Sequence, residues 1–163
     1  MPPITAFLHT HNDALRLGRT LELLLPCSEI VVVDHASTDR TCTVAREYGA
    51  RVVTADCGAE NLHIEQVHNP WVFCIRPGEA ITENLQASLF EWMLAPRGET
   101  SASGFSVFVR EQTSEVTDPQ WLLSSLPQTR LVPRTWSRWH QGLPVHDPSA
   151  VVIEGELLRF AVP

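Results

Sequence analysis

The chain has 163 residues, of which 44% are hydrophobic and 19% charged, a composition typical of one globular domain and not of a disordered protein. The net charge of -7 argues against nucleic acid or an anionic membrane as a partner, because both bind basic surfaces. The four cysteines form no C-x-x-C pair, and neither a signal peptide nor an apolar stretch of about 18 residues is visible. We therefore expect reduced thiols in a cytoplasmic protein.

The first half of the chain alternates predicted strands with predicted helices. Short runs rich in β-branched and aromatic residues predict four strands, at residues 4–9, 29–34, 51–54 and 71–75. Apolar residues at helical spacing predict four helices, at about residues 13–25, 38–48, 60–68 and 82–93. The expected N-caps are Asn12 or Asp13, Ser37 or Thr38, and Thr82. This alternation predicts an α/β fold with an open, mostly parallel sheet flanked by helices.

The second half of the chain predicts a smaller part with mixed or antiparallel strand pairing. Residues 104–110 alternate as a strand, and residues 111–128 read as an irregular excursion. Residues 150–153 and 157–160 predict a hairpin that turns at Glu154-Gly155.

Polar clusters follow three of the four strands predicted in the first half. They are Thr10-His11-Asn12, Asp34-His35 and Arg76-Pro77-Gly78-Glu79. Ligands in open α/β sheets bind outside the carboxyl ends of the strands. The sequence therefore predicts a ligand site where these clusters meet.

The segment D-H-A-S-T-D-R-T, from Asp34 to Thr41, gives the strongest functional signal. A carboxylate at a strand tip can accept hydrogen bonds from a base N–H or from ribose hydroxyls, and the following helix N-terminus favours an anion. The same pattern is also that of an ordinary strand-to-helix turn with an N-cap. The residues alone leave both interpretations open.

Three features near the start of the chain carry a resemblance to a known family. They are T-H-N-D at residues 10–13, the D-H-A-S-T-D-R-T segment, and the helix end Y-G-A-R-V at residues 48–52. Together they resemble glycosyltransferase family 2, and in particular its branch of lipopolysaccharide-core glycosyltransferases. Asn61, Trp71 and the stretch from R-L-V-P-R to V-H-D at residues 130–147 extend the resemblance more loosely.

The resemblance implies a GT-A fold, a UDP-, GDP- or dTDP-sugar donor, and inverting transfer to a saccharide or lipid-linked acceptor of the cell envelope. It divides the single domain, residues 1–163, into a nucleotide-binding half, residues 1–95, and a shortened acceptor-side half, residues 96–163. Members of the family usually continue beyond this length with further helices that shape the acceptor site.

The nucleotide-sugar site implied by the resemblance lies at the ends of the first two predicted strands. Asp34 would contact the donor nucleoside. The residues expected around it are Thr10, Asn12, His35 and Asp39.

The resemblance fails at the metal site. After the fourth strand, family members carry an Asp-x-Asp-Asp/Glu group that holds Mg²⁺ or Mn²⁺ against the donor diphosphate. This chain has Arg76-Pro77-Gly78-Glu79 there, which leaves Glu79 as a candidate ligand. A diphosphate leaving group needs its developing charge neutralised. Either Arg76 replaces the ion with a fixed positive charge, or the protein is a catalytically inactive binding or assembly module with a partner protein or a second copy of itself.

Transfer to a hydroxyl also needs a general base. His146 and Asp147 end the V-H-D stretch and are our first candidates for it. Glu111 and Asp118 are the alternatives.

Two residue types leave alternatives open. Three histidines at the first two strand ends could converge on a transition metal or could lack a common partner; they are His9, His11 and His35. Three tryptophans of the second half could stack on a sugar ring or could pack in the core; they are Trp121, Trp136 and Trp139.

Overall fold

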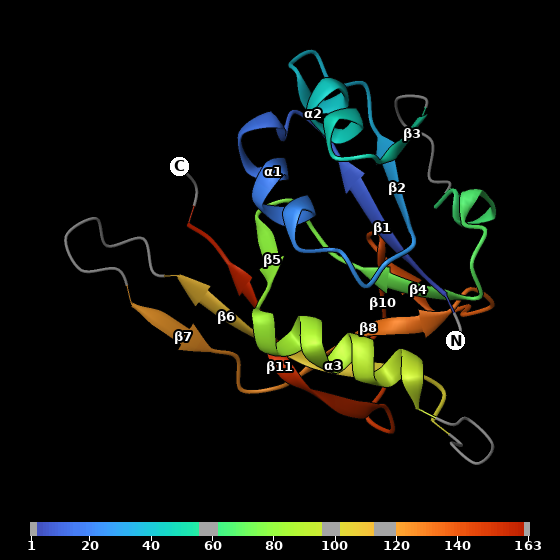
Figure 1. Ribbon diagram of the computed structural model, residues 1–163, viewed down its shortest axis with the longest axis vertical. Coiled ribbons are helices and arrows are strands. Elements are labelled where there is room, and N and C mark those ends of the chain that lie inside the picture. The colour runs from blue at the N-terminus through green and yellow to red at the C-terminus, as the bar shows by residue number, and fades with distance from the viewer. Residues whose placement is uncertain (1–2, 56–61, 96–101, 113–119, 162–163) are drawn as a thin grey trace.

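A single mixed sheet runs through the protein in the computed structural model (Figure 1). The structure describes residues 3–55, 62–95, 102–112 and 120–161. The strand order is β3-β2-β1-β4-β8-β6-β11-β5, and β7 also pairs with β6. These strands are β1 (Ile4–Thr10), β2 (Glu29–Asp34), β3 (Arg51–Thr54), β4 (Trp71–Cys74), β5 (Glu79–Ile81), β6 (Phe105–Gln112), β7 (Trp121–Leu123), β8 (Gln128–Pro133) and β11 (Val151–Arg159). A separate two-stranded ribbon consists of β9 (Trp139–His140) and β10 (Leu143–Pro144).

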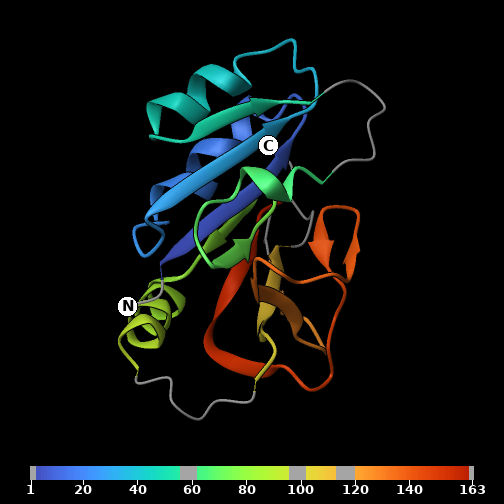
Figure 2. The same ribbon diagram turned by 90° about the vertical axis from the view of Figure 1, so that its right-hand side faces the viewer.

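The first four strands form a parallel half. β1 lies between β2 and β4, and β3 pairs with the outer side of β2, all in the parallel sense. Helices α1 (Ala14–Glu22) and α2 (Thr41–Glu47) pack on one face of these strands, and the 3-10 helix η1 (Ile64–Gln66) lies on the other (Figure 2). The valines of β2 alternate between the two core clusters, so this strand is buried on both faces. The predicted α/β fold with a mostly parallel sheet is confirmed.

Helix α3 (Glu83–Leu94) begins as its sequence predicts. The Thr82 hydroxyl accepts a hydrogen bond from the Leu85 backbone N–H at 3.1 Å and so caps the helix. The helix expected at residues 60–68 is shorter, because η1 is the helical turn found among the described residues there. Asn61 lies outside the described residues.

Helices α1 and α2 are joined at their starts by one carboxylate. The first N–H of α1, at Ala14, donates to Asp39 Oδ2 at 3.2 Å, and the first N–H of α2, at Thr41, donates to Asp39 Oδ1 at 3.0 Å. Helix α2 therefore begins later than predicted. We expected side-chain caps at the starts of these two helices, but the candidate side chains do not form them. These candidates are Asn12, Asp13, Ser37 and Thr38.

The second half of the sheet is mixed, as expected. β8 runs antiparallel to β4 and to β6, and it joins the two halves into one sheet. β11 runs parallel to β6 and antiparallel to β5. The excursion expected at residues 111–128 contains β7, which pairs antiparallel with β6.

The hairpin predicted at residues 150–160 is wrong. Both of its arms belong to the continuous strand β11, whose register shifts between Val152 and Glu156. Gly155 adopts a φ of +103°, and a Cβ there would lie 2.4 Å from the backbone N of Leu85 in α3. The glycine therefore serves a bulge and the close approach of a helix, and does not reverse the chain.

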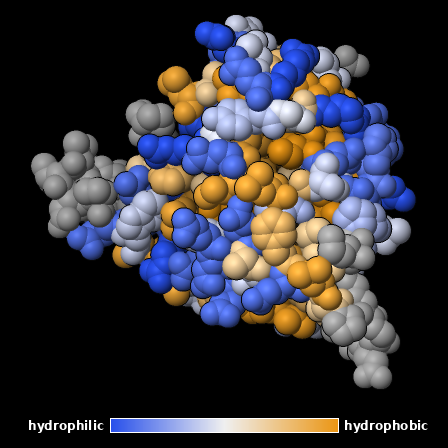
Figure 3. Space-filling model, viewed as in Figure 1, coloured by the Kyte–Doolittle hydropathy of each residue, from blue (hydrophilic) through white to orange (hydrophobic). Residues whose placement is uncertain are grey.

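Apolar side chains reach the surface between polar ones on the face that carries α3 (Figure 3). In α3 itself, Phe90 is 42% exposed and Leu94 70% exposed. None of the described helices is long and apolar enough to cross a membrane.

Candidate functional site

The carboxyl ends of β1 and β2 bring two of the predicted polar clusters together. Thr10 and Asp34 are register partners at the last positions of their strands, and Thr10 Oγ1 donates to Asp34 Oδ1 at 2.8 Å. Ser37 donates to the same carboxylate from its backbone N–H (3.0 Å) and from its hydroxyl (2.5 Å). Burial alone would raise the pKa of Asp34, but the hydrogen bonds from Ser37 and Thr10 hold the pKa below its ordinary value. Asp34 is therefore a charged anchor of the β2–α2 loop, with an exposed fraction of 3%.

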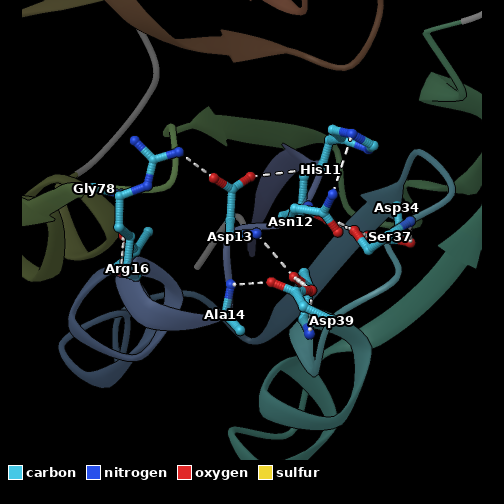
Figure 4. A network of polar contacts seen from close by, with 12 residues as sticks. His11, Asn12, Asp13, Ala14, Arg16, Asp34, Ser37, Asp39 and Gly78 are labelled. Atoms are coloured by element: carbon cyan, nitrogen blue, oxygen red, sulfur yellow. Dashed lines mark hydrogen bonds and ion pairs between the residues drawn. The ribbon is translucent and has the colours of Figure 1, made fainter. Parts of the chain in front are cut away.

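The loop after β1 is hydrogen-bonded to the loop after β2 (Figure 4). The Asn12 backbone N–H donates to the Ser37 hydroxyl at 2.8 Å, and Asn12 Oδ1 accepts from the Thr38 backbone N–H at 2.8 Å. Asn12 adopts a left-handed backbone with a φ of 53°. Asn12 and Asp39 thus fix the shape of this corner, and Asp39 remains exposed to solvent.

Two of the three histidines at these strand ends form a pair. His9 Nδ1 and His35 Nε2 lie 2.8 Å apart, whereas His11 Nδ1 contacts the backbone oxygen of His35 at 2.6 Å. Burial, followed by the charges of His35 and His63, lowers the pKa of His9 to about 4. His9 is therefore neutral near pH 7, and His11 does not join the pair on a common centre.

Two adjoining clefts open beside this network, at the carboxyl ends of β1 and β4. The smaller has a volume of about 390 Å³ and the larger, which we call the arginine cleft, about 780 Å³. Arg16, Arg76 and Pro77 line both clefts. The other walls of the smaller cleft are His9, Asp13, Ile75 and the β9–β10 turn at residues 141–143. Those of the arginine cleft are Gly78, Glu79, Glu111, Gln112, Leu122, Arg159, Phe160 and Ala161.

Glu79 lies at the floor of the arginine cleft and is bonded to two arginines. Arg130 donates to both of its oxygens, at 2.8 and 2.9 Å, and Arg159 donates to Oε2 at 2.9 Å. The backbone N–H of Arg76 adds a bond to Oε1 at 2.9 Å. Burial would raise the pKa of Glu79, but the charges and hydrogen bonds of the arginines hold the pKa below its ordinary value.

These surroundings do not fit a magnesium or manganese ion. Such ions need several oxygen ligands, and both oxygens of Glu79 already accept bonds from guanidinium groups. An ion at Glu79 would also be repelled by Arg130 and Arg159. Within the described ranges, no group of three or more His, Cys, Asp or Glu is placed to hold a metal. The role of metal ligand that we expected for Glu79 has no support in its contacts.

Arg76 differs from the other arginines of the cleft because its side chain is exposed and no described carboxylate lies within ion-pairing distance of it. Partial burial of Arg76, followed by the nearby charges of Arg130 and Arg159, lowers its pKa, although Glu79 raises it. Arg16 pairs with Asp13 (Figure 4). The cleft therefore holds an uncompensated cation at the end of β4.

The roles of three arginines of this region were not predicted from the sequence, namely Arg16, Arg130 and Arg159. Arg130 opens the R-L-V-P-R stretch, and this position was a usable signal. Arginine is usually a surface residue, so its complete burial at the centre of a sheet has no signature in the sequence.

Asp147, the expected general base, is held by several donors. Its carboxylate accepts hydrogen bonds from Ser103 (3.0 Å), Arg138 (2.8 Å) and the Ser149 hydroxyl (2.7 Å). The bonds from Ser149 and Arg138 place the pKa of Asp147 well below its usual range, which weakens it as a base. His146 contacts Thr129 at 3.3 Å.

The alternative bases lie in different places. Neither His146 nor Asp147 lines the two clefts, whereas Glu111 is exposed and lines the arginine cleft. Asp118 lies outside the described residues. The choice of base remains a prediction, and Glu111 is the described candidate that faces a cleft.

The tryptophans have separate environments. Trp136 is 9% exposed and donates its Nε1–H to the backbone oxygen of Arg138 at 2.7 Å. Trp139 donates in the same way to the backbone oxygen of Trp136 at 2.7 Å. Trp121 is 37% exposed and packs edge-on against Phe160, a wall of the arginine cleft. Trp136 thus packs in the core, and Trp121 lies beside the cleft.

Comparison with known sequences relates the chain to glycosyltransferases, although no protein-family model matches it. It is 31% identical to the lipopolysaccharide core biosynthesis glycosyltransferase LpsC of Rhizobium meliloti, over 57% of this chain and 38% of LpsC. It is 29% identical to an uncharacterized glycosyltransferase of Rickettsia felis, over 61% of this chain and 36% of that protein. The chain thus spans little more than a third of the length of these relatives.

Comparison with solved structures shows the fold of the chain. Glucosyl-3-phosphoglycerate synthase of Mycobacterium tuberculosis, solved with Mn²⁺, UDP and glucosyl-3-phosphoglycerate, matches with a TM-score of 0.53 and 19% identity, over 67% of this chain and 44% of that one. S. aureus TarS matches with a TM-score of 0.54 and 16% identity, over 72% and 38%. The chain therefore has a GT-A-like fold and is similar in sequence to glycosyltransferases.

Proposed function

We propose that this protein binds a UDP-, GDP- or dTDP-sugar at the carboxyl ends of β1, β2 and β4 and transfers the sugar to a saccharide or lipid-linked acceptor. The observation that carries the proposal is the pair of adjoining clefts lined by Arg16 and Arg76 at the carboxyl ends of the strands, where such folds bind ligands. The smaller cleft is also lined by His9 and Asp13, which flank Thr10 of the Thr10–Asp34 pair. The similarity to LpsC supports the reaction class. The mycobacterial structural neighbour, which has been solved with UDP-glucose and phosphoglyceric acid, supports a nucleotide-sugar donor.

In this proposal the nucleoside and the diphosphate of the donor have separate sites. The nucleoside binds beside His35 and the loop that Asp34 and Asn12 organise, and the diphosphate extends toward Arg76. Because Asp34 is buried beneath Ser37, it acts mainly by holding this loop, and its direct contact with a nucleoside requires Ser37 to move.

A second candidate function is a glycosyltransferase-like binding or assembly module without turnover. Two observations favour it, namely the replacement of the metal-binding aspartates by Arg76-Pro77-Gly78 and the hydrogen bonds that occupy Asp147. The partner of such a module would be another protein or a second copy of the chain.

Calorimetric titration with UDP, GDP and dTDP, each with and without manganese, tests the binding step. We expect the wild-type protein to bind one of these three nucleotides with a lower Kd than the Asp34→Ala variant does. Transfer or hydrolysis of the matching nucleotide sugar then distinguishes the two candidates. Binding without either reaction, across saccharide and lipid-linked acceptors, would favour the module. A failure to bind any of the three nucleotides would end the glycosyltransferase proposal.

A further inference from the structure

The floor of the arginine cleft is an ion-paired triad with an excess of positive charge. Glu79 carries one negative charge and is bonded to Arg130 and Arg159, which carry two positive ones. Glu79 is 1% exposed and Arg130 0%, so water screens this excess poorly. The triad therefore presents one net positive charge to the cleft above it.

Arg76 adds a second positive charge at the same place. It lines the cleft, its backbone N–H is bonded to Glu79, and no described carboxylate lies within ion-pairing distance of its guanidinium. Arg16 also lines the cleft but is largely neutralised by Asp13. Glu111, on another wall, is exposed to solvent as Arg76 is, and its negative charge offsets one of these two positive charges.

The chemistry of this set matches a diphosphate. Guanidinium groups form paired N–H···O bonds with phosphate oxygens, and Arg is always charged at neutral pH. The net positive charge of the cleft offsets part of the charge of a diphosphate ester. The volume of about 780 Å³ also leaves room for a group larger than one phosphate.

We propose that the arginine cleft is a metal-independent diphosphate site, with Arg76 as its main ligand and Arg159 as the second. Glu79 is a positioning residue that holds Arg130 and Arg159 beneath the ligand. The proposal rests on the proposed function only for the identity of the diphosphate, which is either the nucleoside diphosphate of a donor or the diphosphate of a lipid-linked acceptor.

Titration with inorganic pyrophosphate in buffer with EDTA tests the site directly. We expect binding that weakens at least tenfold in Arg76→Gln, with partial retention in Arg76→Lys, which keeps the charge and loses the fork. The matched control is Arg46→Gln, an exposed arginine of α2 that lines neither cleft. Circular dichroism and the Tm of each variant establish that it is folded.

The arms of the experiment separate this inference from the proposed function. If UDP binds more tightly than pyrophosphate in the absence of metal, and if its binding is weaker in Arg76→Gln, the result supports both the diphosphate site and the proposed function. If pyrophosphate binds through Arg76 and the three nucleotides bind no more tightly than pyrophosphate, the result supports the diphosphate site but not the proposed function. Tight binding of farnesyl diphosphate would then identify a lipid-linked acceptor as the source of the diphosphate. Nucleotide binding that requires Mn²⁺ and is equal in Arg76→Gln would overturn the inference and leave the proposed function standing, and a failure to bind pyrophosphate in EDTA would also overturn it.

Discussion

Arg130 forms two parallel hydrogen bonds with Glu79, at 2.8 and 2.9 Å, and neither residue is more than 1% exposed. β8 supplies the arginine and β5 the carboxylate, so the pair links two strands that are not neighbours in the sheet. The cost of desolvating two charges is high, and the geometry here satisfies both partners. The pair therefore fixes the region on which Arg76 and the arginine cleft are built.

Removal of the charge of Glu79 leaves two arginines without a counter-ion. We expect Glu79→Gln to lower the free energy of unfolding by about 3–5 kcal/mol, since it leaves a buried, unpaired guanidinium. Urea denaturation followed by circular dichroism measures the change. The matched control is Glu156→Gln, which breaks the half-exposed Arg110–Glu156 pair and should cost no more than about 1 kcal/mol. Equal losses in the two variants would contradict a structural role for the buried pair.

The His9–His35 pair predicts a dependence of stability on pH. The pKa of His9 is about 4 in the folded protein, because of burial and then of His35 and His63, against an ordinary value of 6.5. The unfolded chain therefore binds a proton at higher pH than the folded protein does, so the free energy of unfolding falls as the pH is lowered through this window. The slope is up to about 1.4 kcal/mol per pH unit.

Urea denaturation at a series of pH values from 7 to 4, carried out on wild type and on His9→Gln, measures the contribution of His9 to this pH dependence. The variant should lose less stability than wild type over the window. His140→Gln, at an exposed position, should keep the wild-type slope. A His9→Gln protein with the wild-type slope would show that other groups cause the dependence.

Gly155 should not tolerate a side chain. Its φ of +103° is unfavourable for any L residue, and the added Cβ would lie 2.4 Å from the Leu85 backbone N. We expect Gly155→Ala to cost at least about 3 kcal/mol, measured as the shift of the urea midpoint, because strain and overlap act together. Gly49→Ala is the control for strain alone, since its φ is +82° with nothing within 4 Å of the new Cβ, and it should cost about 1 kcal/mol. A loss in Gly155→Ala no larger than in the control would mean that α3 can move away.

Asp34 should affect both stability and nucleotide binding. Asp34→Ala removes the acceptor of the hydrogen bonds from Thr10 and Ser37, and we expect a loss of about 2 kcal/mol or more together with weaker binding of the preferred nucleotide. Thermal denaturation and calorimetry give the two values. Thr43→Ala, at an exposed position of α2, should leave both unchanged. If the Asp34→Ala protein is destabilised but binds the nucleotide with wild-type affinity, this loop is not part of the nucleotide site.

The parallel half of the fold was predictable because its signals are local. The Ile-Val run of β2 and the Thr82 cap of α3 depend on neighbours in sequence, and both were found as expected. The Glu154-Gly155 pair was misread because a glycine after a polar residue looks like a turn, whereas its real cause is the contact with α3, far away in sequence.

The candidate site was predictable in its place but not in its chemistry. The sequence placed Asp34 and Arg76 at the carboxyl ends of β2 and β4, and these ends lie on the same side of the parallel half of the sheet. The burial of Arg130, and its bond to Glu79, follow from the insertion of β8 between β4 and β6. Such long-range pairing has no periodicity that a single sequence can display.

The position of β11 has a consequence for how the protein is made. This last strand lies inside the sheet, with β6 on one side and β5 on the other, and it carries Arg159 to Glu79. During synthesis, β5 and β6 leave the ribosome first, and the side of each strand that pairs with β11 stays unpaired until residues 151–159 follow. The arginine cleft therefore cannot form before residues 151–159 have been synthesised, and a nascent chain arrested before residue 151 would lack it.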